Sequence, residues 1–168
     1  MKNQIQKVKG GYTLVEILFY IALFSVLTLA IINSFVTMTK AFKEISIQSD
    51  LVQSSLAIER MSREIRQAYG INSITTSDLK LNTKDELDNN ETVRFLLSGS
   101  DIQLFENDVL TGNLNTPNIQ VVNLSFTQIT TVNGNAIKIS LSVKSGRDMT
   151  NRVENFYNTV LLRGDYGS

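Results

Sequence analysis

The stretch that decides the fold spans residues 12–36 and reads YTLVEILFYIALFSVLTLAIINSFV. Its 25 residues include one charged side chain, Glu16, close to the beginning of the stretch. A helix of this length would extend over roughly 37 Å at about 1.5 Å per residue. Because about 20 apolar residues suffice to cross the hydrocarbon core of a bilayer, the stretch predicts a membrane-spanning helix.

The residues before this stretch set its expected orientation. Residues 1–11 read MKNQIQKVKGG, a basic segment that contains lysines and no acidic side chain. Under the positive-inside rule this end stays in the cytoplasm and the rest of the chain lies outside. An ordinary secretory signal would have an apolar region of about 7–15 residues and an A-x-A-like cleavage site after it. The apolar run is longer here and the following NSFVTMTKAFKE offers no such site, which favours a single-pass span.

The helix is expected to continue well beyond the apolar stretch. Neither Gly nor Pro occurs from Tyr12 to Tyr69, a run of 58 residues. An apolar stripe with heptad spacing recurs in its second part; it consists of Leu51, Ile58, Met61, Ile65 and Ala68. We therefore predict one helix, or two placed end to end, over residues 12–69, with an amphipathic second part over residues 37–69. Gly70 is the expected C-cap.

After Gly70 the apolar period changes to two, which is typical of half-buried antiparallel strands. The predicted strand segments are residues 93–97, 102–104, 122–126, 137–143 and 156–162. Asn133-Gly134 predicts a hairpin turn, and Asn82–Asn90 and Thr111–Pro117 are the expected loops. The predicted fold is α+β: a β-rich domain over residues 70–168 whose antiparallel sheet packs on the heptad stripe of the long helix.

Composition narrows the possible functions. The chain of 168 residues has 16 basic and 16 acidic side chains, so no surplus of positive charge exists for binding nucleic acid by bulk electrostatics. It has no Cys and no His, which removes thiol catalysis, His-based triads and the commonest metal ligands. A membrane-tethered carboxylate hydrolase would need a pair of acids, and no pair stands out by spacing. A structural or binding protein without a cofactor is therefore expected, rather than an enzyme.

The residues that bear most directly on function precede and open the apolar stretch: Lys9-Gly10-Gly11-Tyr12-Thr13-Leu14-Val15-Glu16. Two glycines make the backbone flexible and sterically open at the cytoplasmic edge of the membrane, as a protease requires. Cleavage after Gly11 would create an α-ammonium group on Tyr12. Glu16 lies four residues further on, hence on the same helix face as Tyr12. It could pair with the Tyr12 amine of a neighbouring subunit, which would set the axial register of a helix bundle. Alternatively, Glu16 lies among the lipid headgroups and has no partner.

This segment, followed by ILFYIALFSVL, resembles the N-terminal signal of the type IV pilin and type II secretion pseudopilin superfamily. The likeness covers about 30 contiguous residues and includes the basic leader, the Gly, an aromatic residue, Thr, Leu, an aliphatic residue and the Glu. Tyr12 departs from the usual Phe but keeps an aromatic ring. The ERMSREIRQA helix end, the β-rich second half and the closing FYNTVLLRG are similar, more loosely, to the J-type minor pseudopilins.

The resemblance implies a pilin fold and a set of roles and partners. Residues 1–11 would be a leader removed by a prepilin peptidase between Gly11 and Tyr12, and the Tyr12 amine would then be methylated. Glu16 would neutralise the N-terminus of a neighbour. The implied partners are the peptidase, other pilin or pseudopilin subunits, an inner-membrane assembly platform and membrane lipid. The implied location is the bacterial inner membrane and then a filament, either a secretion pseudopilus or an adhesion, twitching or competence pilus. A permanently anchored binding module that never assembles is the alternative.

Three further features have two possible interpretations. Hard oxygen ligands cluster at Asp85, Glu86, Asp88 and Glu91 and could hold Ca²⁺, but their spacing is not that of an EF-hand and a solvated acidic loop is the other interpretation. The hydroxyls of Ser25, Thr28 and Ser34 could make interhelical contacts or bond their own backbone carbonyls. Tyr157 and Tyr166 could be exposed for adhesion, or they could pack in the core and lie in the tail.

Overall fold

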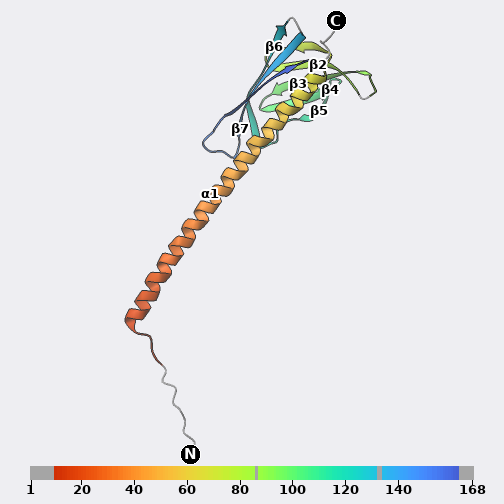
Figure 1. Ribbon diagram of the computed structural model, residues 1–168. Helices are drawn as coiled ribbons and strands as arrows, with labels where there is room; N and C mark the ends of the chain where they lie inside the picture. The colour runs from red at the N-terminus through yellow and green to blue at the C-terminus, as the bar shows by residue number, and fades with distance from the viewer. Residues whose placement is uncertain (1–9, 86, 132–133, 163–168) are drawn as a thin grey trace, which may run out of the picture. The chain divides into compact units, whose positions relative to one another are not determined.

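The computed structural model describes residues 10–85, 87–131 and 134–162, which form one long helix and eight strands (Figure 1). Helix α1 spans Leu14–Gln67 without interruption. The chain divides into two compact units, Met1–Lys43 and Glu44–Ser168, so α1 contributes its first part to one unit and its second part to the other. The sequence predicted one helix or two placed end to end over residues 12–69, and the structure has the single helix over nearly all of this range.

The end of α1 differs from the prediction. Gly70 is not a left-handed cap: it is the first residue of strand β1, Gly70–Ile74, and its φ is not positive. The last turn closes instead through the Ala68 N–H, which donates to the Glu64 carbonyl at 3.0 Å. The Tyr69 N–H then donates to the Asn82 carbonyl at 3.0 Å. The chain therefore passes directly from the helix into the sheet, and a hydrogen bond to a neighbouring strand stabilises this transition.

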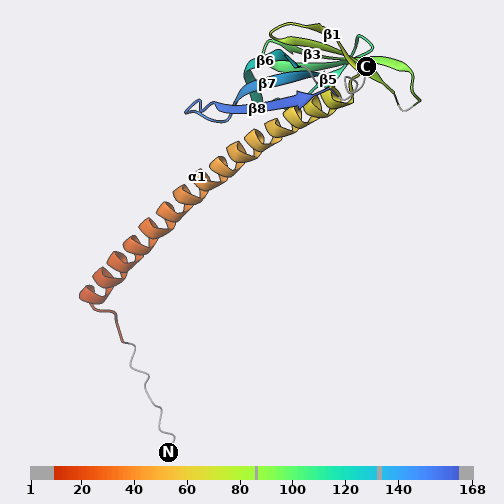
Figure 2. The same ribbon diagram turned by 45° about the horizontal axis from the view of Figure 1, so that its top comes forward.

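The strands of the second unit form two antiparallel meanders rather than one sheet. The first sheet has the order β1-β2-β3-β4-β5, and its further strands are β2 (Asp78–Lys84), β3 (Asn90–Ser98), β4 (Asp101–Glu106) and β5 (Val109–Asn113). The second has the order β6-β7-β8, with strands β6 (Ile119–Thr131), β7 (Gly134–Ser145) and β8 (Glu154–Leu161). Figure 2 shows β8 beside the last turns of α1, where the Asn158 amide donates to the Ser62 hydroxyl at 2.8 Å.

The hydrophobic core joins the second part of α1 to both sheets. The predicted heptad stripe is buried in full, since none of its five side chains is more than 8% exposed. Met61 and Ile65 are fully buried and belong to one cluster with Phe95 of β3 and Leu141 of β7. Burying a side chain of this size stabilises a fold by roughly 1.5–3 kcal/mol. The predicted α+β architecture, a long helix packed on antiparallel strands, is therefore confirmed.

Several predicted loops and strand positions are wrong in detail. Residues 82–84 belong to β2 and Asn90 to β3, so the segment between the two strands is shorter than the predicted loop Asn82–Asn90. Likewise, Thr111–Pro117 is only partly loop, because residues 111–113 belong to β5. In β6 a bulge between Val121 and Asn123 shifts the register, so that Val122 is 52% exposed although the alternation placed it inward.

The predicted hairpin connects β6 and β7. Gly134 has a φ of 130° and pairs with Thr131, so it is the first residue of β7. Asn133, the other residue of the predicted turn, lies outside the described residues.

The connection from β7 to β8 is fastened to α1 by a cluster of charged groups. The Arg152 guanidinium donates to both carboxylate oxygens of Glu44 at 2.9 Å and to Asp148 at 2.8 Å. The Asp148 side chain is only 4% exposed, and it also accepts bonds from the hydroxyl and the backbone N–H of Thr150. A second fastening lies nearby, where the Ser145 hydroxyl donates to the buried Asp50 carboxylate at 3.1 Å.

These contacts perturb the titration of the cluster. The Thr150 hydroxyl, followed by Arg152, holds the pKa of Asp148 well below its usual range, and Arg152 lowers the pKa of Glu44. A carboxyl whose pKa is lowered on folding stabilises the fold above its unfolded pKa, which is about 3.9 for Asp, and loses this contribution as the pH falls further.

Asp148→Asn is therefore expected to lower the thermal unfolding midpoint of the detergent-solubilised protein at pH 7, because the charge that Arg152 and Thr150 stabilise is removed. The difference from the unmodified protein should shrink as the pH falls below about 4, because the Asp148 carboxyl of the unfolded chain then binds a proton while that of the folded chain stays ionised. Circular dichroism melts between pH 3 and pH 7 measure this difference. Glu154→Gln, which removes an exposed carboxylate from β8, is the matched control and should show a smaller effect. A difference for Asp148→Asn that stays constant over the whole pH range would contradict the expectation.

Candidate processing and assembly segment

The two glycines before α1 are sterically open. Gly10 and Gly11 are exposed and lie outside the helix. A Cβ atom built on either residue would meet no other heavy atom within 4 Å. The backbone at the predicted cleavage position is therefore free of the protein's own side chains, as a protease would require. The remainder of the predicted leader, residues 1–9, lies outside the described residues.

Tyr12 lies before the helix rather than on its first turn. It is 74% exposed, and α1 begins two residues later at Leu14. The reason is the local chemistry of Thr13, whose Oγ1 atom accepts a hydrogen bond from the Glu16 N–H at 3.3 Å. An N-cap residue has non-helical backbone angles, so the residue before it cannot belong to the helix. The expectation that Tyr12 and Glu16 share a helix face is corrected in this respect.

The sequence contains a signal for this helix start that the motif-based prediction missed. Thr13-Leu14-Val15-Glu16 has the spacing of a capping box, in which a Thr and a Glu three residues later satisfy backbone N–H groups at a helix N-terminus. Of its two possible bonds, the structure has the one that Thr13 accepts. Glu16 in the first turn also suits the positive end of the helix dipole.

The Glu16 carboxylate has a partner within its own helix. The Tyr20 hydroxyl donates to Glu16 Oε1 at 3.3 Å, and the two residues are one helical turn apart. Glu16 is half-buried, whereas the residues on either side of it are exposed. The motif-based prediction did not include Tyr20, although the i,i+4 spacing of an acid and a hydroxyl-bearing side chain could have identified it.

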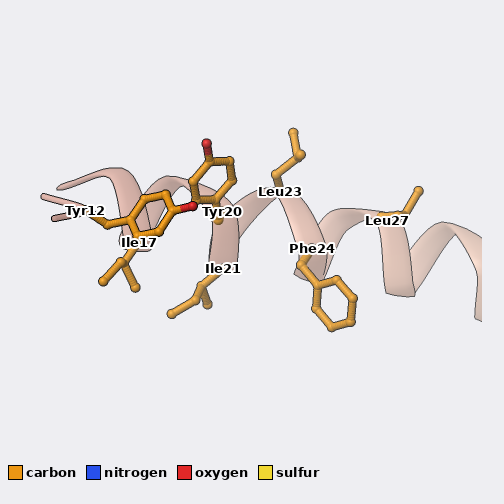
Figure 3. A pocket seen from close by; sticks show the side chains of 7 residues that line it. All are labelled: Tyr12, Ile17, Tyr20, Ile21, Leu23, Phe24 and Leu27. Atoms are coloured by element: carbon orange, nitrogen blue, oxygen red, sulfur yellow. The ribbon is translucent and has the colours of Figure 1, made fainter. Parts of the chain in front are cut away.

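The first part of α1 exposes an almost continuous apolar surface. Its most apolar window has a mean hydropathy of 2.5, and none of that window is buried. Figure 3 shows part of this surface, a shallow pocket along the helix lined by Tyr12, Ile17, Tyr20, Ile21, Leu23, Phe24 and Leu27. By length and composition, α1 can cross a membrane once, and within the described part of the chain it is the one such helix.

The small hydroxyl residues of this surface are satisfied internally. Ser25 donates to the Ile21 carbonyl at 2.8 Å, Thr28 to the Phe24 carbonyl at 2.8 Å, and Ser34 to the Ala30 carbonyl at 2.9 Å. The interpretation in which these residues bond their own backbone is therefore confirmed.

The acidic turn after β2 uses its carboxylates for local contacts. Asp85 accepts bonds from the backbone N–H groups of Leu87 and Asn89 at 2.8 Å, and the Asn89 bonds lower its pKa. Asp88 pairs with Lys84 at 2.7 Å, and Glu91 accepts a bond from Asn107 at 3.2 Å. Glu86, the fourth calcium candidate, lies outside the described residues. Among the residues that are described, no group of three or more acidic side chains is placed to hold a metal ion.

The aromatic residues near the C-terminus do not follow the packing interpretation. Tyr157 is 67% exposed on β8, so the prediction that it packs in the core is wrong. The neighbouring Phe156 packs against the core instead, because successive side chains of a strand point to opposite faces. Tyr166 lies outside the described residues.

Comparison with known proteins adds no relative: no family model, no curated protein and no solved structure matches this chain. The class of protein that the fold and the segment define is an α+β protein whose N-terminal helix is long and apolar enough to cross a membrane.

Proposed function

We propose that this chain is a minor subunit of a type IV pilin-like filament, either a pilus or a type II secretion pseudopilus. It is made as a precursor in the bacterial inner membrane with residues 1–11 in the cytoplasm. A prepilin peptidase cuts between Gly11 and Tyr12 and methylates the new Tyr12 amine. An inner-membrane platform then assembles the mature chain with other pilin or pseudopilin subunits.

The observation that supports this proposal most directly is the apolar surface of α1 between residues 17 and 38. Its large side chains are about 50–70% exposed, and no other element of the described chain covers them. Such a surface needs an apolar environment, and both a bilayer and a bundle of like helices provide one. Transfer from the first environment to the second therefore changes the free energy of the apolar side chains little.

The arrangement at the start of α1 supports the same proposal. The chain is sterically open at Gly11, and Tyr12 is exposed before the helix cap. A carboxylate in an apolar span is costly, by about 2.5–3.5 kcal/mol for an acid at the bilayer centre, which implies a function for Glu16. The amine that cleavage creates on a neighbouring copy is a partner of opposite charge, and one pair per subunit fixes the axial position of adjacent helices.

The direct test is mass spectrometry of the N-terminus of the protein isolated from its native cell. The proposal predicts a chain that begins with Tyr12 and carries one methyl group on its amine. It also predicts that this form is recovered with sheared filaments or with their base complex. An intact Met1 end together with absence from every filament fraction would overturn the proposal and favour a permanent membrane anchor.

A further inference from the structure

The Tyr20 hydroxyl differs from the serine and threonine hydroxyls further along the apolar span. The hydroxyls of Ser25 and Thr28 reach back to the carbonyl one turn earlier and are used within the backbone. The Tyr20 hydroxyl sits at the far end of a rigid ring and donates instead to Glu16 Oε1 at 3.3 Å. It is therefore a donor placed on the one charged side chain that the span contains.

The contact with Tyr20 uses only part of the bonding capacity of Glu16. An ionised carboxylate has two oxygens and about four acceptor positions. Tyr20 bonds Oε1 from the C-terminal side, and the Glu16 backbone N–H is bonded separately by Thr13. Oε2 has no bond to Tyr20, so the carboxylate keeps an acceptor for a further donor.

On the same surface, Tyr20 lies close to Tyr12, the residue whose α-amine the proposed cleavage creates. Tyr12 and Tyr20 line one shallow pocket, and Figure 3 shows their rings on the same stretch of the helix surface. Both ends of the proposed contact, the acid with its hydroxyl donor and the future N-terminus, therefore lie within about two helical turns of each other on one chain.

We propose that Tyr20 is a positioning residue for the assembly contact: it fixes one oxygen of Glu16 and thereby presents the other to the Tyr12 α-ammonium of a neighbouring subunit. This inference rests on the proposed function. Its physical basis is that a carboxylate in apolar surroundings is stabilised by each donor it acquires, and that a side chain already fixed loses less conformational entropy when the second partner binds. Tyr20 thus lowers the free-energy cost of the Glu16 carboxylate in the bilayer, before the chain enters the filament and the carboxylate meets its second partner.

The experiment compares Tyr20→Phe, Glu16→Ala and the double variant in the native cell, with filament incorporation measured by quantitative blotting of sheared filaments. Tyr20→Phe keeps the ring and removes the hydroxyl. It should be cleaved and methylated normally but incorporated about ten-fold less, the effect of roughly 1.4 kcal/mol. The double variant should match Glu16→Ala alone, because a residue that acts through Glu16 has no effect once Glu16 is gone.

Ser25→Ala is the matched control. It also removes one hydroxyl from the span, but that hydroxyl bonds the backbone of its own helix, so incorporation should not change. Unaltered incorporation of Tyr20→Phe would overturn the inference, and so would a double variant that is weaker than Glu16→Ala by the full Tyr20→Phe factor. Failure of the proposed function is distinguishable: in that case the unmodified protein itself would be absent from filaments and would retain its Met1 end.

Discussion

Gly11→Val is expected to leave the chain in the membrane as an uncut precursor. The Gly11 Cβ position meets nothing within 4 Å, so a larger side chain there disturbs no packing of the protein itself. Any loss of processing would consequently arise in the active site of the peptidase, where a branched side chain next to the scissile bond obstructs access and stiffens the backbone. The expected result is near-complete loss of the Tyr12-initiated form, measured by the mass of the membrane-extracted protein.

Gly10→Val provides the matched control for this experiment. Its site is equally open, since a Cβ atom there also has no neighbour within 4 Å. The same substitution one residue further from the cut should leave most of the protein processed. Normal processing of Gly11→Val would refute the cleavage assignment, and an equal block by both variants would mean that the cut position is not read from Gly11.

The fold could be predicted from the sequence at positions where burial alone determines whether the residue is apolar or polar. The heptad stripe is an example: Leu51, Ile58 and Ile65 are apolar at helical spacing because one face of α1 packs on the sheets, and all three are buried. The division into two sheets was not predictable in the same way. Strand pairing, and the contacts between the two sheets such as the bond from the Phe126 N–H to the Thr76 carbonyl at 2.9 Å, join distant segments through backbone groups that every sequence possesses.

Strand β2 was not predicted from the sequence, and the reason is a different one. Its sequence, DLKLNTK, alternates correctly, and Leu79 and Leu81 are fully buried. Its outward positions are polar, however, and Asn82 is a residue with low β-propensity. Asn82 is accepted in the strand because the Asn72 side-chain amide of β1 donates to its side-chain oxygen at 3.0 Å. A cross-strand partner thus outweighed a local preference, and the partner lies ten residues away in the sequence.

In the candidate segment, the sequence motif indicates which residues are candidates, but it does not predict the hydrogen bonds that they make. Gly11, Tyr12 and Glu16 follow from a motif, and Glu16 from the cost of an acid in an apolar span. The capping bond of Thr13 required a second interpretation of the same four residues. The bond from Tyr20 required knowing which hydroxyls the helix backbone leaves unused, and this follows only when each one is placed.

Glu16→Ala is expected to be inserted and cleaved but almost absent from filaments. Removing one member of a buried ion pair costs about 3–5 kcal/mol, because the other charge is left unpaired. At about 1.4 kcal/mol per factor of ten, incorporation should fall by at least about a hundred-fold. The helix start should persist, because the bond to Thr13 comes from the backbone N–H of residue 16 and survives the substitution. Quantitative blotting of sheared filaments measures the loss.

The amount of the Glu16→Ala variant in the membrane separates an effect on assembly from an effect on insertion. Glu16→Ala removes an acid from the span, so the variant should be at least as abundant in the membrane as the unmodified protein. Glu59→Ala, which removes an exposed acid from the amphipathic second part of the same helix, is the matched control and should be incorporated normally. If Glu16 has a partner in the filament, its removal raises the amount of protein in the membrane and lowers the amount in the filament. An acid without such a partner would not give this combination. Unreduced incorporation of Glu16→Ala would instead mean that Glu16 lies among the headgroups and sets no register.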